Sequence, residues 1–267
     1  MTYETVRYEK KDHIATITLN RPQALNSFSL KMNSELYKIW DDIKFDPQVR
    51  VAVVTAAGDR AFCTGVDVKE SADLGAIDSL DAEDRYAETG RKLRITARMN
   101  DCFKPVVTAV NGMVVGGGLH FIADTDICIC SENATFFDTH LEIGWVAFIE
   151  PIGLSRRVPL ERIMRMVLMG SKERIDAREA YRIGLVSQVV PLSELVSTAT
   201  AIAETIAEKA PLATMLSVEA IWRGLDMGME EAKMLGAKIN RVNLKGVDYI
   251  EGPQAFAEKR KPQWQGR

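Results

Sequence analysis

Hydrophobic residues in the first half of the chain follow two different spacings. Residues 14–19 place side chains alternately on two faces, which is typical of a strand, and this run breaks at Pro22. From Ser29 onward, apolar side chains recur every three or four positions and stop before Pro47. This spacing predicts an amphipathic helix with Ser29 as its N-cap.

Three later segments have no such alternation. Residues 49–55 are almost continuously apolar and β-branched, apart from Arg50, and residues 106–110 and 127–130 are similar. Continuous apolar strands are typical of a sheet that is covered on both faces. Because helical stretches separate these strands, the sequence predicts an α/β class with parallel strands and crossover helices.

The second half begins with one more helix–strand pair and is then helical only. The expected elements are a helix over 177–184, a strand over 185–190, and helices from Ser193 to about Ala210 and from Pro211 through Trp222. We therefore expect a core carrying the active site over residues 1–192. Residues 193–267 are expected to form a helical C-terminal region.

Composition excludes several classes of protein. The chain has 267 residues, of which 46% are hydrophobic and 27% charged, and its net charge is −3. Without a positive excess, neither nucleic acid nor an anionic membrane is expected as a partner. The chain has no apolar run of membrane-spanning length and no apolar leader, so we expect a cytoplasmic protein. The four cysteines fit neither a disulfide framework nor a zinc site and are expected to be thiols.

The amino-acid composition changes between Glu70 and Gly90, where acidic and small residues predominate and large apolar ones are few. This composition favours a solvated surface helix, and a lid over a site is the alternative.

Three consecutive glycines, Gly116 to Gly118, follow the predicted strand at 106–110. Glycine lets the backbone turn sharply and lets another molecule approach it without interference from a Cβ atom. A helix beginning here would direct unpaired N–H groups at that molecule. The segment therefore has the outline of an oxyanion site, and a tight packing turn is the alternative. It matches neither common phosphate-binding loop.

A second segment, RAFCTGVDVKE over residues 60–70, follows the strand at 49–55. Together with KPVVTAVNGMVVGGGLH over 104–120, it resembles the two signature segments of the crotonase (enoyl-CoA hydratase/isomerase) superfamily. Further similarities occur in the family's order, at Asn20-Arg21-Pro22, at residues 134–144 and in the C-terminal GPQAFAEKRKPQWQGR. The resemblance implies a spiral of ββα repeats with a helical C-terminal segment for trimer formation.

The resemblance also implies an enzyme that acts on an acyl-CoA thioester. In this family, the backbone N–H groups of Val66 and Gly117 would form a hole for the thioester oxygen. Adding water to the conjugated alkene, or removing a proton beside the thioester, places negative charge on that oxygen. Two preorganised donors would stabilise the resulting enolate.

Coenzyme A would enter as part of the substrate, with no separate cofactor and no metal. The residues that the resemblance places along it are Phe62, Thr64, Gly65, Asp67, Val68, Gly116, Phe256 and Lys259. The last two would reach the nucleotide, often from a neighbouring subunit, and a surface helix with a buried aromatic is the alternative. The expected assembly is a homotrimer or a hexamer of two trimers.

The chain departs from the family at its acid–base positions. Hydratases of this family carry two glutamates there, whereas this chain has His120 and His140, two of its only three histidines. Imidazole titrates near neutral pH and can act as base or acid. We expect both histidines to be catalytic. We expect His13, in the first strand, to be structural.

Three carboxylates lie nearby in the sequence: Asp138, Glu142 and Glu150. Glu142 becomes the acid–base residue if the loop register shifts by two, and Glu150 lies near a position that isomerases of the family often make acidic. Either glutamate could instead orient an imidazole, and a solvated loop carboxylate is the alternative for each.

Two other activities stay open. Relatives that cleave carbon–carbon bonds in β-diketones by a retro-Claisen reaction use a histidine pair with an aspartate, and this chain resembles them in its two histidines. A non-catalytic protein that binds acyl-CoA is the alternative of another class. Because Phe256 and Lys259 favour retained CoA binding, an acyl-CoA substrate is the preferred prediction.

Overall fold

A mainly parallel sheet forms the centre of the molecule. The computed structural model describes residues 3–73 and 93–266. The larger sheet has six strands in the order β1-β2-β3-β5-β7-β10. Their bounds are Val6–Lys11, Ile14–Leu19, Val51–Ala56, Val106–Val110, Ile127–Ser131 and Gln188–Val190. Only β1 and β2 pair antiparallel in this sheet, so the predicted α/β class with parallel strands is confirmed.

A smaller sheet repeats the same order of strands. It runs β4-β6-β8-β9, and its bounds are Ala61–Cys63, Met113–Val115, Thr135–Phe137 and Ile175–Asp176. Each turn of the chain adds one strand to each sheet: β3 then β4, β5 then β6, β7 then β8. Since β4, β6 and β8 are parallel, the repeat advances as a spiral.

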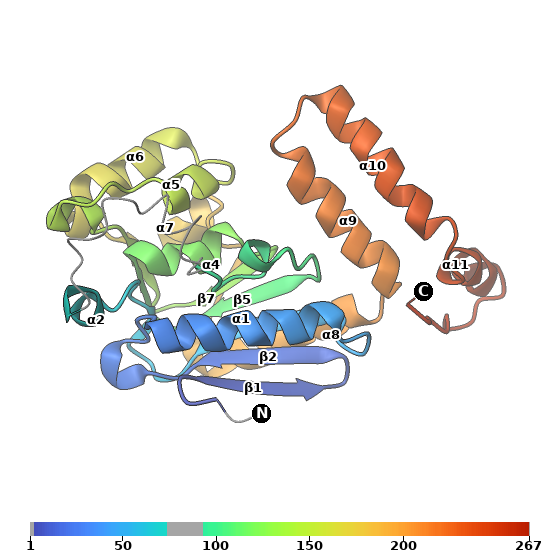
Figure 1. The fold of residues 1–267 in the computed structure, drawn as a ribbon, viewed down its shortest axis with the longest axis horizontal. Coiled ribbons are helices and arrows are strands. Elements are labelled where there is room, and N and C mark those ends of the chain that lie inside the picture. The colour runs from blue at the N-terminus through green and yellow to red at the C-terminus, as the bar shows by residue number, and fades with distance from the viewer. Residues whose placement is uncertain (1–2, 74–92, 267) are drawn as a thin grey trace.

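Helices surround this spiral and extend beyond it. Their bounds are α1 Leu30–Phe45, α2 Val68–Asp73, α4 His120–Ala123, α5 Ile149–Leu154, α6 Leu160–Met169, α7 Ala177–Arg182, α8 Leu195–Ala207, α9 Pro211–Gly224, α10 Met229–Asn243 and α11 Asp248–Ala257. Figure 1 shows α9, α10 and α11 projecting away from the sheets as an arm. None of the described helices has both the length and the apolar character needed to cross a bilayer.

The central strands of the large sheet are buried on both faces, which explains their continuous apolar sequences. In β3, Ala52 and Val54 point to the main core, where α1 packs, whereas Val51 and Val53 point to a second core formed with α8. Successive side chains of a strand point to opposite faces, so burial on both sides requires apolar residues at every position.

The helix predicted from Ser29 is α1. The Ser29 hydroxyl accepts a hydrogen bond from the Met32 amide at 3.1 Å, which caps the helix as expected. Its apolar stripe packs into the main core, and the indole of the fully buried Trp40 donates to the Ile95 carbonyl at 2.8 Å. The four cysteines are buried and unpaired.

The expected division at residue 192 does not coincide with the packing. Helix α8 begins at Leu195 and buries Leu195, Ala199, Ala203 and Ala207 against the large sheet. The helices that stand apart from the sheet begin at Pro211. Small apolar residues at helical spacing allow α8 to approach the strands closely. Of the acidic segment at Glu70 to Gly90, residues 74–90 lie outside the described residues.

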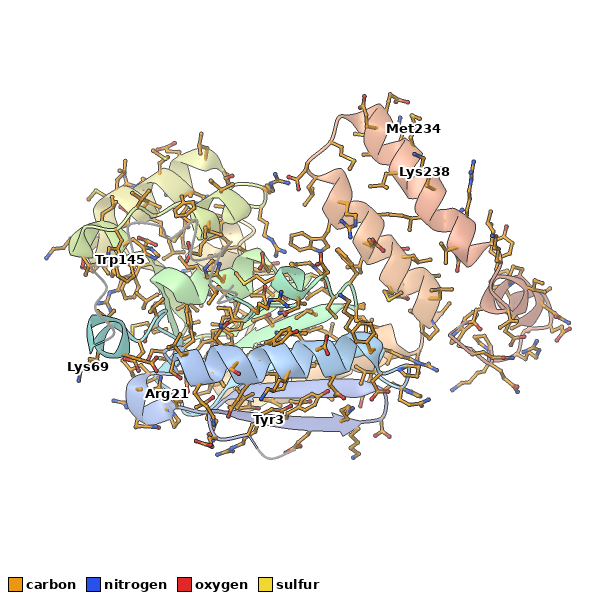
Figure 2. All side chains as sticks on the ribbon, viewed as in Figure 1. Tyr3, Arg21, Lys69, Trp145, Met234 and Lys238 are labelled. Carbon is orange, nitrogen blue, oxygen red and sulfur yellow. The ribbon has the colours of Figure 1, made fainter. Side chains whose placement is uncertain are left out.

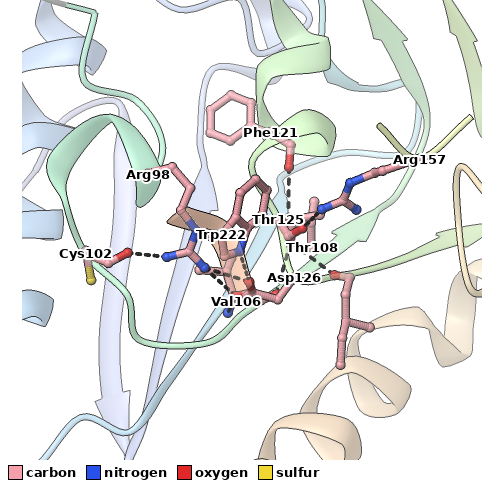
Figure 3. A network of polar contacts seen from close by, with 10 residues as sticks. Arg98, Cys102, Val106, Thr108, Phe121, Thr125, Asp126, Arg157 and Trp222 are labelled. Carbon is pink, nitrogen blue, oxygen red and sulfur yellow. Dashed lines mark hydrogen bonds and ion pairs between the residues drawn. The ribbon is translucent and has the colours of Figure 1, made fainter. Parts of the chain in front are cut away.

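A largely buried polar network joins the arm to the core (Figure 3). The Asp126 carboxylate accepts two hydrogen bonds from one Arg98 nitrogen, each at 2.7 Å. It also accepts the Trp222 indole N–H of α9 at 2.6 Å and the Val106 amide of β5 at 2.7 Å. The side chains of Arg98 and Asp126 are 9% and 17% exposed, so each group depends on the other for charge compensation.

We expect Asp126→Ala to destabilise the protein strongly. The substitution leaves the Arg98 guanidinium buried without its carboxylate, and breaking such a pair costs about 3–5 kcal/mol of unfolding free energy. Urea unfolding at fixed protein concentration measures this loss. Asp226→Ala is the matched control, because Asp226 pairs with Arg156 on the surface and is 71% exposed. Its loss should stay below about 1 kcal/mol, and equal losses for the two variants would contradict the prediction.

Candidate active site

Two glycine-containing turns bring their backbones into contact. A Cβ atom added to Gly65 would lie 2.9 Å from the Gly117 nitrogen, and one added to Gly117 would lie 3.3 Å from the Gly65 Cα. Gly65 also has a φ of +84°, a conformation that glycine adopts without strain. Only glycine at these positions permits the approach of the two turns.

The Val66 amide faces away from its strand neighbour. Phe28 and Val66 form a parallel bridge, in which Phe28 N donates to the Gly65 carbonyl at 2.8 Å and Asp67 N donates to the Phe28 carbonyl at 3.0 Å. In a parallel bridge of this register, the middle residue turns its own N–H to the opposite side. The Val66 N–H is therefore free of this pairing, next to the contact between Gly65 and Gly117.

The glycine triplet continues directly into the helical segment that carries His120. Gly116–Leu119 form a 3-10 helix and α4 adds one further turn. Gly117 lies at the start of this segment, where backbone N–H groups have no partner in a preceding turn. Since the segment is short, individual backbone amides contribute more to the binding of a negative oxygen here than a helix dipole does.

His140 lies beside the same turn. A Cβ atom added to Gly116 would lie 3.5 Å from the Cε1 atom of its ring. The Asp138 carboxylate accepts a hydrogen bond from the backbone N–H of His140 at 2.8 Å, and its other oxygen lies 2.8 Å from ring Nδ1. Asp138 is 0% exposed. The other ring nitrogen, Nε2, is directed toward Glu150 and lies 4.0 Å from its Oε1 atom.

His120 reaches the same carboxylate oxygen. Its Nε2 atom lies 3.0 Å from Glu150 Oε1, and the two side chains are 5% and 6% exposed. They meet because α4 packs closely on α5, where a Cβ atom on Gly153 would lie only 3.0 Å from the Ala123 methyl group. The site thus contains two imidazoles that share the carboxylate of Glu150.

The charges of the site perturb its titration. The hydrogen bond to Asp138 raises the pKa of His140, against an opposing effect of burial, and the nearby Glu150 charge raises it further. Burial would raise the pKa of Glu150, but the hydrogen bond and charge of His120 outweigh it and lower this pKa. Both shifts favour the charged forms, so imidazolium is stabilised between two carboxylates.

The structure does not bring Glu142 to the imidazoles. Its carboxylate accepts the Ser171 amide at 2.7 Å on the surface, and hydrogen bonding by the Ser171 side chain and backbone lowers its pKa. The register shift that would have made Glu142 the acid–base residue does not occur, because Asp138 holds the turn at His140. Glu150, the other glutamate considered, faces both rings.

Phe62 belongs to the core. Its side chain is fully buried and packs edge-on against Phe121 at 5.6 Å between ring centroids, so any contact of this residue with CoA would come from its backbone. Asp67 pairs with Arg21 at 2.8 Å, which fixes the first loop against this segment. Thr64 is half-buried and Val68 is exposed, at the two ends of the segment around Val66.

The two expected tail residues lie on the arm. Phe256 belongs to α11 and is 87% exposed, and Lys259 follows this helix and is also exposed. The alternative of a buried aromatic is therefore wrong for Phe256 in the single chain. In Figure 2, Trp145 lies at the opposite end of the molecule from Met234 and Lys238 of the arm. The Trp145 ring is 6.4 Å from that of His140, so Trp145 marks the site.

Sequence reasoning did not single out Asp138 as a partner of His140. A detectable signal was present, because an aspartate commonly accepts the backbone N–H of the residue two positions later. Within the part of the chain that the structure describes, no group of three or more His, Cys, Asp or Glu side chains is arranged to hold a metal ion.

Comparisons with known proteins agree with this architecture. The model of the enoyl-CoA hydratase/isomerase family matches residues 9–267. The (E)-benzylidenesuccinyl-CoA hydratase of Thauera aromatica is 37% identical over 98% of this chain and 99% of its own. The carnitinyl-CoA dehydratase of Proteus mirabilis (strain HI4320) is 32% identical over 99% of each. A crystal structure of an enoyl-CoA hydratase/isomerase from Mycobacterium paratuberculosis is 41% identical, covers both chains completely and has a TM-score of 0.88.

The chain therefore belongs to the enoyl-CoA hydratase/isomerase family, within the crotonase superfamily, and is an enoyl-CoA hydratase-like enzyme. The expected crotonase-type fold is confirmed as well.

Proposed function

We propose that this enzyme is a lyase that adds water reversibly to the double bond of an enoyl-CoA thioester, with a histidine as its acid–base group. The observation that carries this proposal is the position of the His140 and His120 Nε2 atoms, 4.0 and 3.0 Å from one Glu150 oxygen, beside the Gly65–Gly117 turns. A base and the two amides for a thioester oxygen are thereby combined in one place.

In the first step, His140 Nε2 takes a proton from water. The water oxygen forms a bond to the β-carbon, and the electron pair of the double bond moves through the α-carbon to the thioester oxygen. The N–H groups of Val66 and Gly117 would donate to this oxygen while it is negative. Such donors act mainly on the transition state, because they are already oriented before charge develops.

In the second step, the His140 imidazolium returns the proton to the α-carbon. The enolate electron pair forms the new C–H bond, the thioester carbonyl is restored, and the neutral imidazole is regenerated. Asp138 and Glu150 stabilise the imidazolium in between, consistent with the raised pKa of His140. His120 holds Glu150 in place and is the second group that can move a proton.

The CoA portion is proposed to lie along Thr64–Val68 and the Gly116 turn. Phe256 is 87% exposed on the arm, as expected for a residue that completes the nucleotide site of another subunit. We accordingly propose a homotrimer, alone or paired as a hexamer.

Turnover of a panel of enoyl-CoA thioesters tests this function. The panel should include straight-chain and aryl-substituted acyl groups, because the relatives include a benzylidenesuccinyl-CoA hydratase. Loss of the conjugated thioester absorbance, with mass-spectrometric detection of the 3-hydroxyacyl-CoA, is the expected result. A pure protein that binds CoA thioesters without converting any of them would support the non-catalytic alternative.

Retro-Claisen hydrolysis of a β-diketone is the second candidate. The pairing of imidazoles with a late carboxylate, Glu150, favours it, because the resemblance to carbon–carbon hydrolases requires such an acid. In that reaction, histidine activates water to attack one carbonyl, and the amide hole would hold the departing enolate. Turnover of free β-diketones without any conversion of enoyl-CoAs would select this activity.

A further inference from the structure

We propose that Asp138 is a positioning residue that fixes His140 in the tautomer with its proton on Nδ1, so that Nε2 remains the acceptor in the site. This inference rests on the proposed function for its kinetic consequence. Its structural part, the tautomer itself, can be tested without any substrate.

The geometry leaves one arrangement of protons at this carboxylate. The backbone N–H of His140 can only donate, and it occupies Asp138 Oδ1 at 2.8 Å. The second oxygen, Oδ2, lies 2.8 Å from ring Nδ1. A carboxylate accepts and does not donate, so the hydrogen of this contact must belong to Nδ1. Since neutral imidazole carries one proton, Nε2 is then left with its lone pair.

Burial makes this arrangement rigid. Asp138 is 0% exposed, and the described hydrogen bonds to its carboxylate both come from His140. A buried carboxylate that lost these bonds would be left uncompensated, which is costly. The short loop between Asp138 and His140 therefore has little freedom to rotate the ring.

Other groups around the ring do not set the tautomer in the same way. Glu150 of α5 faces Nε2 at 4.0 Å, beyond hydrogen-bond distance, and its nearer partner is His120 of α4 at 3.0 Å. Glu142, on the turn that His140 begins, is directed to Ser171. The Arg174 guanidinium stacks on Phe137, the residue before Asp138, at 4.3 Å from the ring centroid.

The decisive variant is Asp138→Asn, which keeps the shape and changes one acceptor into a donor. The His140 backbone N–H retains the single oxygen of the amide, so the amide NH₂ group is left facing Nδ1. The ring must then accept at Nδ1 and carry its proton on Nε2, the wrong tautomer for a base. We expect kcat to fall by about 10²–10⁴-fold, with KM within a few-fold of the unmodified enzyme.

The pH profile should change as well. His140 is a base only when neutral, and its raised pKa places the acidic limb of kcat/KM above the ordinary value for histidine. Removing the Asp138 charge lowers the pKa of His140. The acidic limb of the residual activity of Asp138→Asn should therefore move to lower pH. A merely structural role would lower activity without moving the limb.

Nitrogen NMR of the unmodified protein provides a readout that needs neither turnover nor a folded Asp138 variant. The chain has three histidines, so the His140 signals can be assigned with His13 and His120 variants. We expect protonated Nδ1 and unprotonated Nε2 above the pKa of His140. A proton on Nε2 would overturn the proposal even if hydratase activity is found, and the expected tautomer in a protein without turnover would leave only the proposed function contradicted.

Asp176→Asn is the matched control. Asp176 also accepts a backbone N–H, from Glu179 at 2.8 Å, but it caps α7 and faces no imidazole. Asparagine caps helices about as well as aspartate, so kcat and the pH profile should not change. Equal behaviour of Asp138→Asn and Asp176→Asn, with kcat within about three-fold of the unmodified enzyme, would contradict the proposal.

Discussion

His140→Ala lowers kcat by about 10²–10⁴-fold on an enoyl-CoA substrate, while affinity for a CoA thioester stays within a few-fold. The reason is that the variant loses the proposed proton acceptor but keeps the backbone amides and the segment from Thr64 to Val68. General acid–base catalysis by a positioned side chain contributes an effect of this size. Single-turnover kinetics and calorimetric titration with a CoA thioester measure the two quantities separately.

His13→Asn is the control for this variant. His13 lies in the turn before β2 with a φ of +68°, a conformation that asparagine tolerates, and its Nδ1 atom contacts the Gln48 carbonyl. Its substitution should leave kcat within about two-fold. A His140→Ala enzyme with normal turnover would refute the role of this imidazole.

Glu150→Gln tests the contribution of the Glu150 charge independently of the two imidazoles. It leaves the side-chain shape but removes the charge shared by His120 and His140, so a smaller loss than for His140→Ala is expected.

Gly65→Ala is expected to lower kcat/KM by about 10²–10³-fold through the amide pair. The added methyl group would lie 2.9 Å from the Gly117 nitrogen, too close for an unchanged backbone, so the two turns must separate. Losing one preorganised donor to a developing oxyanion costs about this much. The loss should appear with every acyl group tested, because the thioester oxygen is common to all of them.

Gly184→Ala controls for backbone strain. Its φ of +81° is close to the +84° of Gly65, but a Cβ atom there would meet nothing nearer than 3.7 Å. Both variants should lose stability in urea unfolding, Gly65→Ala more because of its additional clash, and only Gly65→Ala should lose activity. Equal activity losses would attribute the effect to strain and contradict the assignment of the amide pair.

The local parts of the fold were predictable because burial leaves a periodic signal in the sequence. The helix from Ser29 and the strand at 106–110 occur where their spacing predicted them. Helix α8 was assigned to the C-terminal region, because small apolar residues at helical spacing do not reveal which surface covers them. The sheet that covers α8 is formed by strands much earlier in the chain.

The candidate site was predictable only in part. The glycine segments and the two histidines follow from motif and order, but a motif position does not reveal the direction of a side chain, such as the buried ring of Phe62. Glu142 and Glu150 could not be distinguished from the sequence, since both follow His140 closely enough in the chain for either carboxylate to reach an imidazole. The turn at Asp138 decided between them by fixing His140.

The sequence by itself determined the class of the fold, the family and the two histidines at the candidate acid–base positions, because these depend on residue type, order and local spacing. Only the tertiary structure decided which carboxylate lies next to which imidazole ring. That choice depends on the packing of α4 on α5 through Ala123 and Gly153, and on the burial of Asp138. Both are set by contacts across the fold, which no local spacing records.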